Sequence, residues 1–300
     1  MEYVAIGKPS VLENNEYLQS VLHKINAVTH STDAQNPQKT IDDLVQSTDK
    51  TIIAVGGDGM LNGVMNSVIK YNKKNPIAVI ACGSGNAAQW NYHIYHGYSP
   101  VPTQRQRIDD SLAVILENNQ EERDILNTTY RNKSLYSSWL SIGYSADIIF
   151  EREEVGSRNY FIPALRIIPP SAFFPSKRQE IPLQLEDSTI NTVITKPLLA
   201  VFSASVEYFG HGIMISPHTK RGKITATVYD HSVWSAIPCL PLALLGKDVY
   251  SSQYYANIVR IRKPASIAVE ADGERLVNGG ECDLTIQLIP NALNMIVGKK

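Results

Sequence analysis

The chain has 300 residues, of which 43% are hydrophobic and 19% charged, and its formal net charge is −1. This length allows two domains with cores of their own, and the composition is that of a globular protein. A net charge near zero, without long basic runs, argues against nucleic acid as a partner. Three cysteines without a CxxC pair do not form a disulfide framework. We expect no signal peptide and no transmembrane segment, because no apolar run approaches about 20 residues.

The part of the chain before Gly97 alternates short apolar runs with amphipathic ones. Strands are predicted at Tyr3–Gly7, Ile25–Thr29, Thr51–Val55 and Ile77–Ala81, and helices at Val11–Lys24, Ile41–Gln46 and Leu61–Tyr71. This alternation predicts a Rossmann-like parallel sheet with helices on both faces.

Two glycine-rich turns follow two of these strands. Gly56-Gly57-Asp58-Gly59 comes after the strand that ends at Val55, and Gly83-Ser84-Gly85-Asn86 comes after the strand that ends at Ala81. Parallel strands deliver such turns to the same edge of a sheet, where helix N-termini favour anions. The pair therefore indicates a phosphate site, although each turn alone could serve only to reverse the chain. Asn86 could contact a phosphate or cap the following helix.

The pattern becomes rich in strands after the loop Gly97–Pro102. Strands are predicted at Ser111–Glu117, Glu122–Thr129, Ser134–Ile142, Ile181–Leu185, Ile194–Ser203, Lys223–Tyr229, Asn257–Arg262, Ala265–Ala271 and Cys282–Ile289, and helices at Asn159–Ile168 and Pro238–Leu245. Many short strands favour an antiparallel β-sandwich. We expect an α/β nucleotide-binding domain over residues 1–105, a mainly antiparallel β-sandwich domain that binds lipid over 106–290, and a tail over 291–300 that returns to the first domain.

The ordered motifs resemble those of the catalytic family of diacylglycerol and sphingosine kinases. Gly56–Gly59 and Gly83–Ala87 resemble its two phosphate loops, and Asn62 and Asn66 resemble its pattern in the helix between them. Further matches are Ser141–Asp147, Tyr208–Pro217, Gly246-Lys247 and Asp272-Gly273-Glu274. The family consists of soluble lipid kinases that share a distant fold with NAD kinase.

The resemblance implies ATP and Mg²⁺ as cofactors and assigns roles to the motif residues. Asp58, Asp272 and Glu274 are the candidate catalytic acids, with Asp58 and Glu274 as candidate metal ligands. One acid would hold Mg²⁺ and the other would accept the proton of the acceptor hydroxyl, and we expect an interdomain cleft to bring them together. The resemblance leaves open whether Asp58 or Asp272 is the base. Asp-Gly is also a common hairpin turn. The candidate nucleotide-binding residues are Gly56, Gly57, Gly59, Asn62, Gly83, Ser84, Gly85 and Asn86.

Two further residues are candidates for binding the substrate. By resemblance, Asp147 faces the polar end of the lipid acceptor, and the alternative is a solvated acid at a strand end. Arg158 lies near the family's phosphate-binding arginines, with the register off by one. The sequence departs from the family at Lys220-Arg221-Gly222, where bacterial diacylglycerol kinases carry the acids of a structural magnesium site. That metal site is not expected here.

These features predict an ATP-dependent kinase that phosphorylates the hydroxyl of diacylglycerol or a sphingoid base. The alternatives are an NAD kinase-like enzyme with a soluble acceptor and a nucleotide-binding regulator without catalysis. The expected partner is a lipid at a membrane surface, which implies a cytoplasmic protein with transient peripheral membrane association. A homodimer is compatible with the sequence.

Overall fold

A computed structural model describes most of the chain and divides it into two compact units. The described residues are 2–83, 87–92, 103–131, 133–143, 146–147, 151, 173–187, 191–195, 197, 199–204, 206–207, 219–230, 232, 252–263, 267–276 and 280–298. Unit 1 comprises Met1–Arg123, Tyr208–Gly212 and Asn291–Lys300, and unit 2 comprises Asp124–Glu207 and Ile213–Pro290. Strands β5 (Gln120–Tyr130) and β16 (Cys282–Ile296) contribute residues to both units.

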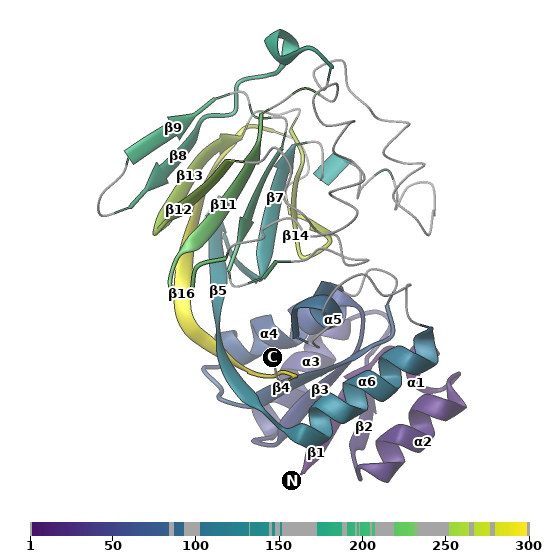
Figure 1. Cartoon of the computed structure of the whole chain (residues 1–300). Coiled ribbons are helices and arrows are strands. Elements are labelled where there is room, and N and C mark those ends of the chain that lie inside the picture. The colour runs from purple at the N-terminus through teal and green to yellow at the C-terminus, as the bar shows by residue number, and fades with distance from the viewer. Residues whose placement is uncertain are drawn as a thin grey trace. The chain divides into compact units, whose positions relative to one another are not determined.

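The centre of unit 1 is a parallel sheet (Figure 1). Its strands are β1 (Tyr3–Gly7), β2 (Val28–Ser31), β3 (Thr51–Gly56) and β4 (Pro76–Ala81), in the order β2-β1-β3-β4, and the end of β16 pairs with β4. All of these pairings are parallel. The β1 and β3 side chains are buried throughout, as expected for strands that are covered on both faces. The predicted Rossmann-like sheet is confirmed.

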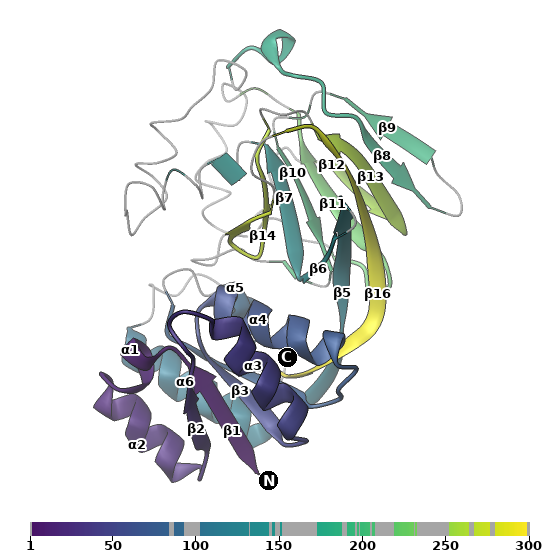
Figure 2. The ribbon, with the colours of Figure 1, turned by 180° about the vertical axis from the view of Figure 1, so that it is seen from behind.

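Helices cover both faces of this sheet (Figures 1 and 2). The helices are α1 (Pro9–Leu12), α2 (Glu16–Lys24), α3 (Pro37–Ser47), α4 (Asp58–Lys70), α5 (Ala87–Tyr92) and α6 (Gln104–Glu117). Helices α2 and α6 pack over one face, where Leu18, Leu22, Ile108 and Ile115 join a single core with Ile53 and other alternate strand residues. Helix α4 packs against β3 and β4 and is covered by α3.

The strand predicted at Ser111–Glu117 is wrong, because these residues form the second half of α6. The helix begins with a capping box: the Thr103 hydroxyl accepts from Gln106 N–H, and the Gln106 side chain accepts from Thr103 N–H. Buried Ile108, Leu112 and Ile115 follow helical spacing. The β-branched run at its end concealed this pattern.

Three other predicted segments have different bounds in the structure. The single helix predicted over Val11–Lys24 is two helices, because the Asn15 side chain caps a new helix by accepting from Leu18 N–H at 3.0 Å. The strand predicted at Ile25–Thr29 is β2, displaced toward Ser31. The helix predicted at Leu61–Tyr71 begins earlier, at Asp58, so that the aspartate of the first glycine-rich turn is helical.

Unit 2 consists of antiparallel strands in two groups. One group continues from β16 in the order β16-β13-β8-β9, and the other has the order β12-β11-β10-β7-β14-β15. The remaining bounds are β6 (Lys133–Ser137), β7 (Trp139–Gly143), β8 (Leu183–Glu186), β9 (Asn191–Ile194), β10 (Leu199–Ser203), β11 (Ile224–Tyr229), β12 (Ser252–Ala256), β13 (Ile258–Lys263), β14 (Val269–Ala271) and β15 (Glu274–Arg275), with a 3-10 turn at Pro175–Lys177.

One apolar core joins the two groups of strands, as in a sandwich. Leu185, Ile261 and Ile286 from the first group share this core with Phe202 and Ile142 from the second. The predicted antiparallel β-sandwich is therefore confirmed. Two long predicted strands, Ser134–Ile142 and Ile194–Ser203, are each divided between two strands, and β12 was not predicted. The helices predicted at Asn159–Ile168 and Pro238–Leu245 lie outside the described residues.

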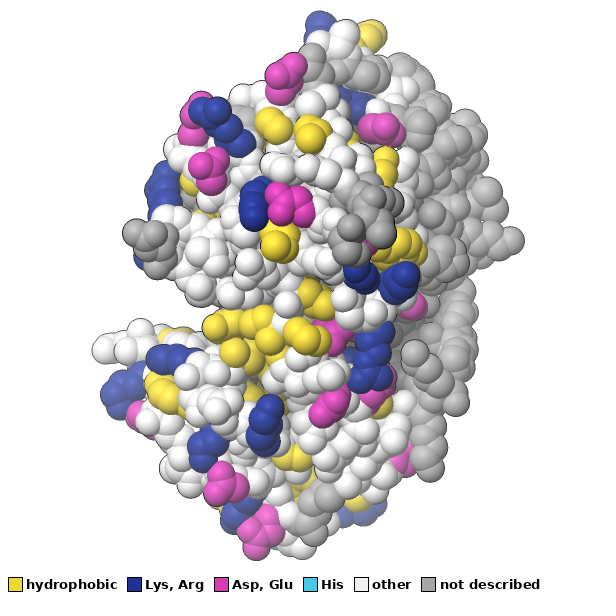
Figure 3. Space-filling view, turned by 90° about the vertical axis from the view of Figure 1, so that its left-hand side faces the viewer, with side chains coloured by type: hydrophobic (Ala, Val, Ile, Leu, Met, Phe, Trp, Pro, Cys, Tyr) yellow, Lys and Arg dark blue, Asp and Glu magenta, His cyan; other side chains and the backbone are white. Residues whose placement is uncertain are grey.

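The described surface has no strong charge asymmetry on the face shown in Figure 3, where lysine and arginine side chains alternate with acidic ones. Within the described ranges, no helix combines the length and the apolar character that crossing a bilayer requires.

Candidate functional site

The two glycine-rich turns of unit 1 lie side by side. Strands β3 and β4 are parallel neighbours, and Gly56 pairs with Ala81 in their register. The Gly56 carbonyl accepts from Cys82 N–H at 2.8 Å and from Gly83 N–H at 3.2 Å. The prediction that both turns lie at the same edge of the sheet is confirmed, and backbone hydrogen bonds join them directly.

Gly57 packs closely against Gly83, the first residue of the second turn. A Cβ added at Gly57 would lie 3.2 Å from the Cα of Gly83, which is closer than most side chains tolerate. Gly57 is also the N-cap residue of α4, and its carbonyl accepts from Met60 and Leu61. This packing leaves backbone, rather than side chains, at the start of a helix of 13 residues. Such helix N-termini favour bound phosphate.

Asp58 links the two turns through its side chain. It is the first residue of α4, is half-buried, and accepts a hydrogen bond at Oδ2 from Ala87 N–H at 3.1 Å. Ala87 is the first residue of α5. The carboxylate thus lies at the N-termini of two helices, where its negative charge is stabilised and where it is next to any phosphate that these turns bind.

Asn62 is buried in the second turn of α4. Its side-chain and main-chain oxygens accept from Asn66 Nδ2 at 3.0 and 2.9 Å. The two asparagines that resemble the family pattern therefore contact each other within one helix. Gly59 follows Asp58 in the first turn and is exposed.

Cys82 lies beside the two turns, between β4 and Gly83. Burial raises the pKa of its thiol to about 11, and this effect outweighs the opposing influence of Gln104 and Arg107. A thiol that stays protonated is a poor nucleophile. Cys82 therefore contributes packing, rather than covalent chemistry, to this edge of the sheet.

For the remaining predicted site residues, the structure describes little or nothing of the side chain. Ser84, Gly85, Asn86 and Arg158 lie outside the described residues. Asp147 is half-buried shortly after β7, next to the buried Ala146. For Glu274 the backbone is described, and it pairs with Ala271. The substrate-binding roles of Asp147 and Arg158 stay predictions.

In unit 2, Asp272 and Gly273 form the two-residue turn that connects β14 and β15. Their φ angles are +48° and +89°, as in a type I′ hairpin, which favours Asp-Gly. The strands pair on either side of the turn through Ala271 and Glu274. The backbone of Asp272-Gly273 therefore forms a hairpin turn, which is the alternative that the sequence left open.

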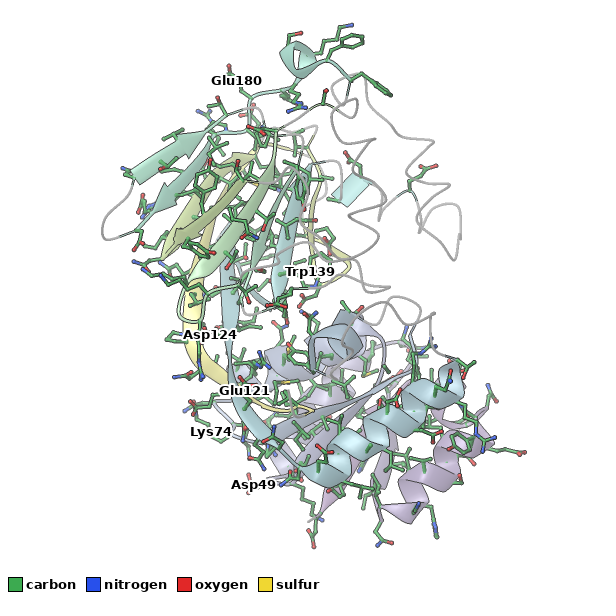
Figure 4. All side chains as sticks on the ribbon, viewed as in Figure 1. Asp49, Lys74, Glu121, Asp124, Trp139 and Glu180 are labelled. Carbon is green, nitrogen blue, oxygen red and sulfur yellow. The ribbon has the colours of Figure 1, made fainter. Side chains whose placement is uncertain are left out.

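The Asp272 side chain does more than form a turn. It is 4% exposed, and its carboxylate accepts from Ser138 N–H at 3.0 and 3.1 Å and from Trp139 N–H at 3.1 Å. The Trp139 carbonyl accepts in return from Asp272 N–H at 3.3 Å. Trp139 begins β7 and is labelled in Figure 4. Backbone N–H groups thus hold the carboxylate in one orientation.

A second buried acid, which the sequence reasoning missed, lies two residues earlier. Glu270 is 0% exposed and accepts from the Ser141 hydroxyl at 2.6 Å and from Gly273 N–H. The sequence feature that could have identified it is a glutamate in the otherwise apolar run Ile267–Ala271. In the structure this glutamate pairs with the middle of β7. A charge in such a run indicates a specific partner.

The close approach of Gly83 to Gly57 brings the start of the second turn to the N-terminus of α4, where a bound phosphate is favoured. Among the described residues, no group of three or more His, Cys, Asp and Glu side chains is arranged to hold a metal ion. Mg²⁺ usually takes one or two carboxylates and completes its shell with phosphate oxygens and water. Asp58 fits that role as a single ligand.

Comparisons with known proteins agree with this geometry. Residues 7–128, which include both glycine-rich turns, match the diacylglycerol kinase catalytic domain. No curated protein matches the chain. A structure of a diacylglycerol kinase from Bacillus anthracis str. Sterne superposes with a TM-score of 0.67 at 18% identity, covering 99% of this chain and 97% of that one.

A second crystal structure from Bacillus anthracis str. Sterne gives a TM-score of 0.69 at 17% identity, with the same coverage of 99% and 97%. A crystal structure of yeast NADH kinase with NADH gives 0.51 at 11% identity, covering all of this chain and 84% of that one. At these identities the likeness concerns the fold. Residues 7–128 therefore match the family that the sequence motifs resemble, and the chain as a whole has the fold of these diacylglycerol kinase and NADH kinase structures.

Proposed function

We propose that this protein is an ATP-dependent lipid kinase, which transfers the γ-phosphate of ATP to the hydroxyl of diacylglycerol or a sphingoid base. The observation that carries this proposal is the close approach of two glycine-rich turns at one edge of the unit 1 sheet, joined by Asp58 and Ala87. The matched catalytic domain supports a kinase. The order of the motifs supports a lipid as the acceptor.

Phosphoryl transfer asks the protein mainly to position the reactants and to stabilise charge. When bound, ATP with Mg²⁺ supplies the phosphoryl group and a cation that neutralises phosphate charge. In our proposal the backbone N–H groups of Gly57–Gly59 and of Ser84–Asn86 bind the phosphates, while Gly56 and Gly83 hold the two turns together and Asn62 supports the first turn. Asp58 holds the metal or accepts the acceptor's proton.

Asp272 is the second acid in the proposed reaction, with Glu274 beside it as the second candidate metal ligand. The N–H groups of Ser138 and Trp139 donate to its carboxylate and fix its direction. An ionised carboxylate can accept the hydroxyl proton as phosphate is transferred. Asp58 and Asp272 are both candidates for this role.

A second candidate function is a kinase with a soluble dinucleotide acceptor. The fold likeness to yeast NADH kinase favours it, since that likeness extends over all of this chain. The order of the motifs after Asp58 favours the lipid kinase. A nucleotide-binding regulator without catalysis is the remaining alternative.

The test is transfer of labelled γ-phosphate from ATP to a panel of acceptors. Diacylglycerol and sphingosine are presented in mixed micelles, and NAD is presented in solution, each with Mg²⁺. We expect a labelled lipid product with one of the two lipids. Labelled NADP would identify the second candidate instead, and no product with any acceptor from folded protein would contradict both kinase functions.

A further inference from the structure

Unit 2 contains a fully buried carboxylate that the proposed reaction does not use. Glu270 lies in the middle of β14, opposite Ser141 of β7, and is 0% exposed. Burying an ionised carboxylate is unfavourable unless hydrogen bonds compensate for the lost water. Glu270 does not reach solvent, which excludes direct contact with a substrate. Its function must act through the residues that it touches.

The contacts of Glu270 connect the sheet to the turn that carries Asp272. One oxygen accepts from the Ser141 hydroxyl at 2.6 Å, and the other accepts from Gly273 N–H. Ser141 belongs to β7, and Gly273 is the second residue of the turn. The carboxylate therefore joins the turn to the strand whose first residue, Trp139, contacts Asp272.

The turn needs such support because its own conformation is demanding. Asp272 has a φ of +48°, which L-residues adopt at an energetic cost, and only two β15 residues follow the turn in the sheet. Two side chains hydrogen-bond the turn to its surroundings: Asp272 accepts from Ser138 and Trp139, and Glu270 accepts from Gly273.

We propose that Glu270 is a positioning residue for Asp272. It fixes the Asp272-Gly273 turn against β7 through Gly273 N–H and the Ser141 hydroxyl, and this sets the direction of the Asp272 carboxylate. The catalytic consequence rests on the proposed function, in which Asp272 takes part in phosphoryl transfer. The effect of Glu270 on the turn does not rest on the proposed function, because it depends only on contacts within unit 2.

The test combines two readouts on the full chain: amide hydrogen exchange and steady-state kinetics with the lipid that the acceptor panel identifies. Glu270→Leu removes the hydrogen bonds to Ser141 and Gly273 at similar side-chain volume. Glu270→Gln can keep both, because its oxygen accepts from Gly273 and its amide donates to the Ser141 oxygen. Asp124→Leu is the matched control. Asp124 is also buried, at 4% exposed, and accepts at 2.8 Å from N–H of a turn glycine, Gly222.

In Glu270→Leu we expect the amides of Ser138, Trp139 and Gly273 to exchange about tenfold faster. We expect kcat to fall by about 10²-fold with little change in the KM for ATP, as for a misplaced catalytic group. Glu270→Gln should keep most of the wild-type protection of these amides and most of the wild-type kcat. Asp124→Leu should lower thermal stability but leave these three amides and kcat near the wild-type values.

Unchanged exchange at Ser138, Trp139 and Gly273 in Glu270→Leu would overturn the proposal, as would an equal loss of kcat in Asp124→Leu. If Glu270→Leu does not fold, Ser141→Ala removes one hydrogen bond and should change exchange and kcat in the same direction by about threefold, and no change would again overturn the proposal. If wild-type protein has no kinase activity, the proposed function fails, while the exchange result still decides whether Glu270 holds the turn.

Discussion

Each unit has a glycine next to a candidate catalytic aspartate, Gly57 before Asp58 and Gly273 after Asp272, and the two glycines are needed for different reasons. In unit 1, Gly57 has an ordinary φ of −100°, and its missing side chain makes room for Gly83. In unit 2, Gly273 has a φ of +89°, and among the described residues nothing lies within 4 Å of where its Cβ would be. The first glycine is required by close approach, and the second is required by backbone conformation.

The aspartates differ in the same way. Asp58 is half-buried at two helix N-termini and accepts from Ala87 N–H, so it lies where phosphates are favoured. Asp272 is 4% exposed and is held by Ser138 and Trp139. A short sequence motif alone therefore does not determine the physical role of its residues. The following variants separate a role in chemistry from a role in structure.

The largest effect is expected for Asp58→Ala. Removing a well-placed charged group should lower turnover by roughly 10²–10³-fold, with the fold retained because the side chain is half-buried. Labelled transfer to the lipid acceptor measures this loss. Asp49→Ala is the control, since Asp49 is an exposed acid of the same unit that pairs with Lys73. A variant at position 58 that keeps half of the wild-type rate would remove Asp58 from the mechanism.

Asp272→Asn should lower both turnover and stability. The amide NH₂ group would replace an oxygen that accepts from backbone N–H groups, so donors would face donors. We expect turnover to fall roughly 10²-fold and the free energy of unfolding to fall by about 1–3 kcal/mol. Kinetics and urea unfolding measure the two effects. Wild-type turnover in this variant would show that catalysis does not depend on this carboxylate.

The two glycines can be compared directly by calorimetry and by unfolding. Gly57→Ala should weaken ATP binding about tenfold, because its Cβ pushes the second turn away. Gly273→Ala should leave ATP affinity unchanged and lower the free energy of unfolding by about 1–2 kcal/mol, because alanine is strained at positive φ. Gly273→Asn should lose less, since asparagine tolerates this conformation. The comparison fails if Gly57→Ala binds ATP as the wild type does.

The smallest effect is expected for an acid of unit 1 with a purely structural role. Burial opposes ionisation of Asp42, but hydrogen bonds from Lys70, Ser67, Gln38 and Tyr71 outweigh it and lower its pKa from 3.8 to about 2. Because the folded pKa lies below the unfolded value, the stabilisation is complete above pH 3.8 and is lost as the pH falls through about 2. We expect a contribution of about 1 kcal/mol after solvent screening.

The free energy of unfolding of the wild type and of Asp42→Asn, measured from about pH 6 to about pH 2, gives this contribution. This range extends about two pH units to either side of the ordinary carboxyl pKa. The difference in unfolding free energy between the two proteins should shrink toward pH 2. A difference that is constant over this range would show that ionisation of Asp42 does not stabilise the fold. Turnover at neutral pH should be the same in both.

Much of unit 1 was predictable because its signals are local. Strand Tyr3–Gly7 was predicted with its observed bounds, and both glycine turns were assigned to one sheet edge, because buried parallel strands form continuous apolar runs. Helix α6 was missed in part, since its β-branched end resembles a strand, although Thr103 and Gln106 carry a helix-start signal.

Unit 2 was harder to predict because its contacts join residues that are far apart in the sequence. The motif located Asp272, but its partners Ser138 and Trp139 contribute backbone N–H groups, which no sequence pattern marks. Glu270 and Ser141 are separated by 129 positions and meet only because β14 pairs with β7. Such pairs follow from strand register, which local patterns do not determine.

The central claim is that the two glycine turns of unit 1 bind the phosphates of ATP. It is tested most directly by following backbone amide NMR signals of the full chain as ATP and Mg²⁺ are added, with adenosine as the comparison. We predict that the signals of Gly57, Gly59, Gly83 and Ala87 shift with ATP and not with adenosine, while Gly222 of unit 2 is unaffected. ATP binding that leaves all four signals unchanged would contradict the account.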